Sequence, residues 1–225
     1  MSLYSLQKKP LTFKLDDQWI PGTADYTLAL SPFPTVQFAR GLDYLLAYPY
    51  GCVEQTTSKL FPLLYFDQLL SAVEEGTFEG NADYYITEGI EKIEAMQLRD
   101  GSFAYWPGGN YSNEWSSVYT AHFLVEARKA GYVISDRVYN RMISYLKKIA
   151  RGSESNIYRL QSKIYALYVL SLNGTPDFST MAYWRRYAPD NITSYTRALL
   201  AAAYFYTGDR IAARGILPES FAVTV

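Results

Sequence analysis

The sequence contains almost none of the residues that build metal centres or disulfides. There is one cysteine and one histidine in 225 residues. A single cysteine excludes an internal disulfide, and the same shortage excludes a cysteine-based zinc cage. We therefore expect this chain to use neither a metal nor a cofactor.

Excess charge and long apolar runs are also missing. The 21 basic and 22 acidic residues leave a net charge of −1, which gives no electrostatic reason to expect nucleic acid as a partner. No apolar run reaches the roughly 18 residues of a membrane-spanning helix, so we expect no direct membrane insertion. The start, MSLYSLQKKP, lacks the apolar stretch of a secretory signal, and any export signal is expected to lie outside this sequence.

Apolar and aromatic residues are plentiful. Apolar residues make up 49% of the chain and aromatic residues 16%, including 22 tyrosines. This composition is typical of a globular protein, and the length allows one large domain with a sizeable core, or one domain plus a fragment.

The first 33 residues differ in pattern from the rest. Residues 11–15 and 26–30 alternate apolar and polar side chains as strands do, and a proline-rich break follows at 31–34. Two strands are too few to be stable alone. We interpret 1–33 as a β-type extension, the remnant of a preceding domain, and 34–225 as the main domain.

From about residue 35 onward, apolar residues recur every three or four positions, which predicts helices. Gly131, Gly174 and Gly208 follow three of these helices as left-handed caps, at intervals typical of helical-hairpin repeats. The predicted fold is all-α, an α/α-toroid of helical hairpins forming an incomplete ring. Besides a first helix from about 35, the predicted helices are 52–73 (kinked or broken at Pro62), 82–97, 115–130, 135–150, 157–172, 178–187 and 192–206.

The single cysteine lies in the stretch YPYGCVEQTTS, three residues before a glutamine. At the start of a helix, Cys52 and Gln55 would share one face with roughly 5–6 Å between their Cβ atoms. Attack of the thiolate on the Gln55 amide, with loss of ammonia, would give an internal thioester, and the first helical N–H groups could stabilise the oxyanion. The alternative is a buried structural cysteine.

The surrounding residues carry a family resemblance. Residues 49–56, PYGCVEQT, resemble the thioester signature of the alpha-2-macroglobulin and complement family, G-C-x-E-Q with a preceding proline, and look most like its bacterial members. Residues 97–109, QLRDGSFAYWPGG, and 115–122, WSSVYTAH, are similar to a second stretch of the same domains. The likeness covers most of residues 35–225.

This resemblance implies a thioester domain, cut short at its C-terminus, from a larger broad-spectrum protease inhibitor that is not an enzyme. Cys52 would be the thiol leaving group, and Gln55 the acyl carbon that a protease lysine attacks. Pro49, Gly51 and Glu54 match motif positions, and no mechanistic role is assigned to Glu54 beyond a first-turn partner of the helix dipole. The implied partners are proteases and other domains of the parent chain. The implied location is the periplasm, the cell envelope or the extracellular space, in a host-defence role.

Some members of the family have a downstream histidine that takes over the acyl group. His122 does not map onto it, and its helical face predicts a satisfied core or groove histidine. The resemblance therefore implies direct aminolysis.

Phe103 and Trp106 are predicted to pack between helices beside loops at 100–101 and 107–109. We expect the thiol and the amide to face each other at the domain surface.

Two other functions remain open. Residues 97–106 also resemble a signature of terpene cyclases, which are α-toroid enzymes, and glycan-active toroids use paired carboxylates such as Glu74 with Glu75 or Glu91 with Glu94. However, the only acidic pair of the type that cyclases need, at 16–17, lies in the strand-like extension. The last alternative is a non-covalent interaction module with an inactive thioester site.

Overall fold

The computed structural model describes residues 51–65, 82–151, 156–188 and 192–217. The chain divides into two units, 1–34 and 35–225, and every described residue belongs to the second. Three sequence predictions lie outside the described residues: the β-type extension at 1–33, the turn at Pro49 and the helix beginning near residue 35.

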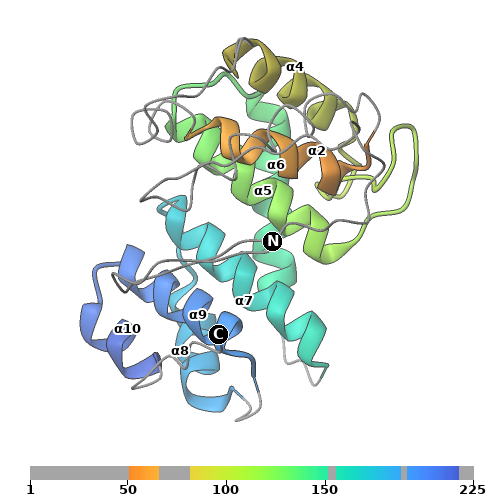
Figure 1. Ribbon diagram of the computed structural model, residues 1–225. Coiled ribbons are helices and arrows are strands. Elements are labelled where there is room, and N and C mark those ends of the chain that lie inside the picture. Colours follow the sequence, from red (N-terminus) through yellow and green to blue (C-terminus); the bar gives the residue numbers. More distant parts are fainter. Residues whose placement is uncertain (1–50, 66–81, 152–155, 189–191, 218–225) are drawn as a thin grey trace, which may run out of the picture. The chain divides into compact units, whose positions relative to one another are not determined.

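The described residues form helices and no strands, with only two isolated β-bridges near residues 97–112. The all-α prediction is confirmed, and the observed ends fall within two residues of those predicted for most helices. No described helix is long and apolar enough to span a membrane. The helices are α2 (Val53–Leu63), α4 (Ala82–Ala95), α5 (Glu114–Lys129), α6 (Asp136–Ala150), α7 (Ile157–Leu172), α8 (Phe178–Tyr187), α9 (Ser194–Tyr206) and α10 (Arg210–Ile216) (Figure 1).

Two helices need comment. The helix predicted over 52–73, with a kink or break at Pro62, ends at Leu63, one residue after this proline, which agrees with the predicted break. The short helix α10 was not predicted. Its seven residues are too few to show a helical period.

Local side chains define where the helices begin and end. The side chains of Asn113, Asn156, Asp177, Thr193 and Asp209 each accept a hydrogen bond from a backbone N–H in the first turn of the helix that follows. At the other end, the predicted glycine caps are confirmed. Gly131, Gly174 and Gly208 have φ angles of 98°, 75° and 86°.

Helix α7 lies at the centre of the described fold. It packs against α5, α6, α8 and α9, while α5 also packs against α2 and α6, and α2 against α4. Figure 1 shows α7 between α5 and α9. The contacts bury one continuous apolar core, to which nearly every described helix contributes. This core holds α2 firmly on α5, and α2 is the helix that begins with the cysteine motif.

A long loop between α4 and α5 is fastened to α6. The Gln97 side chain donates to the Val138 carbonyl at 2.8 Å. Gly101 has a φ of 91° and packs so closely on α6 that a Cβ there would lie 2.2 Å from the Arg141 carbonyl oxygen. The Gln97–Phe103 stretch that resembles a cyclase signature therefore clamps this loop to a neighbouring helix.

The two aromatic residues of this loop behave differently. Phe103 is fully buried, as predicted, and its N–H donates to the Ser117 hydroxyl at 3.2 Å. The prediction for Trp106 is wrong, because its side chain is 56% exposed. Trp106 begins a tight turn in which the Gly109 N–H donates to its carbonyl. Of the described rings, only Tyr105 makes a ring contact with it, so no helix covers the indole.

Candidate thioester site

Cys52 and Gln55 form a reciprocal cap at the start of α2. Cys52 is the N-cap residue, and its sulfur accepts a hydrogen bond from the Gln55 N–H at 3.4 Å. In return, the Cys52 N–H donates to the Gln55 side-chain oxygen at 3.0 Å. This is the geometry of a capping box. The thiol and the carboxamide therefore lie on the same side of one helical turn, as the spacing predicts.

The two members of the pair differ in exposure. Cys52 is only 3% exposed, whereas Gln55 is exposed. The prediction that both lie at the surface is right for Gln55 and wrong for Cys52. The next residue, Val53, is fully buried, and its N–H donates to the Tyr105 carbonyl at 2.9 Å. The α4–α5 loop therefore holds the motif in place from outside α2.

Gly51 leaves room for the glutamine side chain. A Cβ at Gly51 would lie 3.2 Å from the Gln55 Cβ, closer than most packed Cβ atoms come. A larger residue at this position would push the carboxamide away from the cysteine. The glycine of the motif thus has a steric role that the sequence pattern only suggested.

Glu54 connects the motif to α5. Its carboxylate accepts a hydrogen bond from the Ser116 hydroxyl at 3.1 Å, across 62 residues of sequence. The Tyr105 hydroxyl lies near the Cys52 sulfur and also near Glu54, and these neighbours, Cys52 first, raise the pKa of Tyr105 above its usual value. From the sequence, Glu54 had no expected role beyond the helix dipole, and Tyr105 was not singled out as a site residue. Only the fold brings them together.

Further polar contacts fix α2 on α5. The Thr57 hydroxyl donates to the Val53 carbonyl at 2.8 Å and lies 3.1 Å from the Thr120 hydroxyl. Both threonines are buried. The Ser58 hydroxyl donates to Tyr119 at 3.4 Å. Two helices joined in this way present the cap as a rigid unit.

His122 lies on α5 within a cluster of rings. Its Nδ1 lies 2.9 Å from the Tyr165 hydroxyl, and its Nε2 lies 3.4 Å from the Tyr168 hydroxyl. The Phe61 ring packs edge-on against the imidazole. These contacts occupy both ring nitrogens, which confirms the prediction of a satisfied core or groove histidine.

We expect the stability of the domain to fall when His122 is forced to take up a proton. Burial, reinforced by the positive charge of Lys129, lowers the pKa of His122 from 6.5 to about 4. The Glu126 carboxylate, 3.9 Å from Nε2, does not outweigh this burial. Between pH 6.5 and about pH 4, His122 is mostly protonated in the unfolded chain and mostly neutral in the folded domain. Unfolding free energy should therefore fall by about 2 kcal/mol from pH 7 to pH 5.

Urea unfolding at several pH values tests this expectation. His122→Gln retains a polar side chain but cannot titrate, so the variant should lose the His122 part of the pH dependence. An unchanged pH dependence in the variant would assign the effect to the carboxylates instead.

Of the paired carboxylates considered for glycan chemistry, Glu74 and Glu75 lie outside the described residues, and Glu91 and Glu94 lie on α4. Glu94 accepts a hydrogen bond from the Ser135 N–H at 2.7 Å, at the N-terminal end of α6. Glu91 lies on the exposed surface of α4. In the described part of the chain, no three His, Cys, Asp or Glu side chains are grouped to hold a metal ion.

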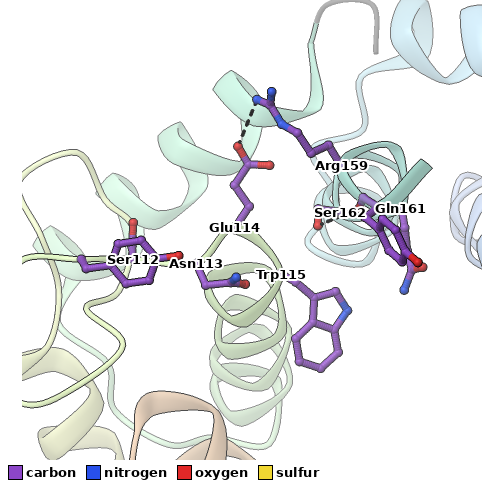
Figure 2. A pocket seen from close by; sticks show the side chains of 9 residues that line it. Ser112, Asn113, Glu114, Trp115, Arg159, Gln161 and Ser162 are labelled. Atoms are coloured by element: carbon purple, nitrogen blue, oxygen red, sulfur yellow. Dashed lines mark hydrogen bonds and ion pairs between the residues drawn. The ribbon is translucent and has the colours of Figure 1, made fainter. Parts of the chain in front are cut away.

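Two open cavities lie at the start of α5. The first, about 380 Å³, lies beside Glu54 and Tyr105. The second, about 390 Å³, lies between the start of α5 and the start of α7 (Figure 2), where Glu114 and Arg159 form an ion pair at 3.4 Å. Both cavities are lined by Tyr111, Asn113 and Trp115, so they are neighbours.

Known proteins share this sequence and this arrangement. An alpha-2-macroglobulin from Rickettsia conorii is 31% identical over 195 residues, which are 82% of this chain and 10% of that protein. Native Escherichia coli alpha-2-macroglobulin superposes with a TM-score of 0.69 at 27% identity, over 80% of this chain and 12% of that one. Salmonella alpha-2-macroglobulin reacted with methylamine gives 0.67 at 27% identity, over 79% and 12%.

The chain spans about a tenth of the length of these relatives. In addition, residues 27–174 match the model of the A-macroglobulin TED domain. That match covers more than half of the sequence and includes the cap, the α4–α5 loop and α5 to α7. This chain belongs to the A-macroglobulin TED domain family.

Proposed function

We propose that this chain is the thioester domain of a protease inhibitor that traps proteases covalently through Cys52 and Gln55. The observation that carries the proposal is the reciprocal cap, which holds the sulfur and the carboxamide on one turn of α2. Proteins of this family are protease inhibitors rather than enzymes. The trap would work once per molecule, because the acyl bond is consumed.

The identity of the cap residue supports chemistry over a purely structural role. Serine, threonine, aspartate and asparagine are the preferred N-caps because their oxygens accept strongly, whereas a thiol sulfur is a weak acceptor. The other caps of this domain follow that preference. Cys52 is therefore a poor choice for capping alone.

Thioester formation would join the two side chains that the cap already brings together. The Cys52 sulfur attacks the Gln55 carboxamide carbon, a C–S bond forms, and the C–N bond breaks with release of ammonia. The Cys52 N–H already donates to the Gln55 side-chain oxygen at 3.0 Å. It is therefore placed to stabilise the negative charge that this oxygen carries in the tetrahedral intermediate.

The trapping step uses the same carbon. A lysine amine attacks the Gln55 carbonyl, an amide bond forms, and the Cys52 thiol is released. Solved structures of relatives include a methylamine-reacted Salmonella protein and a trypsin-activated Escherichia coli protein. By analogy, the partners of this protein would be proteases and the neighbouring domains of its own chain. The proposed location is the periplasm, the cell envelope or the extracellular space.

Intact mass spectrometry of the full-length parent protein tests the thioester. The freshly purified protein should be lighter than its sequence by one ammonia molecule. Methylamine should then add to Gln55 and release one titratable thiol. A protein at its full sequence mass, with Cys52 titrating as a free thiol from the start, would favour a non-covalent interaction module.

A further inference from the structure

A cavity of about 380 Å³ opens beside the cap, and we call it the Glu54 cavity. It lies between the first turn of α2, the α4–α5 loop and the first turn of α5. Its lining residues are Glu54, Tyr105, Tyr111, Asn113, Trp115 and Ser116. One side chain in this set carries a charge, and three contribute aromatic rings.

The charge in the Glu54 cavity has no counter-ion in the described part of the chain. No lysine, arginine or histidine there lies within ion-pair distance of the Glu54 carboxylate. Its hydrogen-bond partner is the Ser116 hydroxyl, at 3.1 Å, and the Tyr105 hydroxyl lies near it. An ionised carboxylate has about four acceptor positions, so these two contacts leave capacity for another donor.

The chemistry of the lining selects an organic cation. Hard metal ions take several oxygen ligands, and the described residues offer no group of three acidic, histidine or cysteine side chains. A protonated amine instead needs one carboxylate and benefits from aromatic faces around it. Tyr105, Tyr111 and Trp115 supply those rings. An anion would be repelled.

We propose that the Glu54 cavity binds the ammonium group of the incoming lysine and that Glu54 accepts its proton. This inference rests on the proposed thioester function and adds an amine-recognition site to it. Glu54 directly precedes Gln55, and Tyr105, which also lines the cavity, has its hydroxyl near both the Glu54 carboxylate and the Cys52 sulfur. Cys52 and Gln55 do not themselves line the cavity, but its lining includes the residue before Gln55 and the tyrosine whose hydroxyl lies near the Cys52 sulfur.

The proton balance follows from these contacts. An ammonium group is not nucleophilic, so it first gives a proton to the Glu54 carboxylate. The neutral amine attacks the Gln55 carbonyl carbon, the C–N bond forms and the C–S bond breaks. The second amine proton passes to the Cys52 sulfur through the Tyr105 hydroxyl, which gives one proton and takes one. Glu54 then loses its proton to solvent.

The rate of thiol release in the full-length parent protein tests this site. Methylamine is a cation at neutral pH and needs the carboxylate, whereas hydroxylamine is largely uncharged and does not. Glu54→Gln should slow methylamine at least about tenfold while hydroxylamine stays within about twofold. Glu114→Gln is the matched control, because Glu114 lines the neighbouring cavity and is paired with Arg159. It should change neither rate.

Equal slowing with both nucleophiles would overturn the inference, because it would give Glu54 a purely structural role. Unchanged methylamine kinetics would also overturn it.

A binding measurement separates this site from the thioester itself. Tetramethylammonium cannot react, so its binding to the Cys52→Ser protein can be followed by saturation-transfer NMR without any thioester. The signal should be lost when Glu54→Gln is added. No signal in the Cys52→Ser protein, or a signal that survives Glu54→Gln, contradicts the cavity. If the wild type instead releases no thiol with either nucleophile, the thioester proposal fails, and the binding result still decides the cavity.

Discussion

Cys52→Ser is expected to abolish covalent trapping by the full-length protein while leaving this domain folded and as stable as before. Serine is a preferred N-cap and, with glutamine three residues later, completes a standard capping box. The reciprocal hydrogen bonds that now join Cys52 and Gln55 can therefore form with oxygen in place of sulfur. We expect a stability change within about 1 kcal/mol. Serine cannot form the thioester, so ammonia loss, methylamine addition and covalent protease adducts should all disappear.

Denaturing gels of the full-length protein mixed with a protease measure covalent trapping, and urea unfolding measures the change in stability. Cys52→Ala is the companion variant, since it removes the thiol and the cap together and should also cost roughly 1 kcal/mol. A Cys52→Ser protein that still forms covalent adducts would contradict the proposed chemistry. Large destabilisation by Cys52→Ser would show instead that the sulfur has a packing role.

Gly101→Ala is expected to destabilise the domain by several kcal/mol. Gly101 has a φ of 91°, and an added Cβ would lie 2.2 Å from the Arg141 carbonyl oxygen and 2.7 Å from its carbonyl carbon. These are backbone atoms of α6, which cannot rotate away as a side chain can. The strained conformation and the forced separation of loop and helix should together cost roughly 3–5 kcal/mol.

Gly108→Ala provides the matched control for the backbone strain. Gly108 also has a positive φ, of 71°, but nothing lies within 4 Å of the position of its Cβ. Its substitution should therefore cost only about 1 kcal/mol. Thermal unfolding of both variants separates the two contributions. Equal losses of stability in the two variants would mean that the loop and α6 can move apart at Gly101 at little cost in free energy.

Damage at Gly101 should also reach the cap. The loop that Gly101 anchors continues to Tyr105, whose carbonyl accepts the Val53 N–H at 2.9 Å. We expect the Gly101→Ala protein to form less thioester even where it remains folded.

The sequence by itself determined the local features of this protein. Helices α7 and α8 begin and end where their apolar periods and cap residues predict, and the glycine caps adopt positive φ angles. The facing of Cys52 and Gln55 also follows from sequence, because residues three apart at a helix start are neighbours whatever the rest of the fold does. The family could be identified for a related reason, since its signature is contiguous.

Only the tertiary structure decided how buried each side chain is and which distant groups meet. Trp106 was expected to pack between helices and is instead exposed, while Cys52 was expected at the surface and is buried. Glu54 meets Ser116 across 62 residues, and His122 meets Tyr165 across 43. No local pattern encodes such pairs, because they depend on how α2, α5 and α7 pack. The Glu54 cavity exists for the same reason, as its walls come from three segments that become neighbours only when the helices assemble.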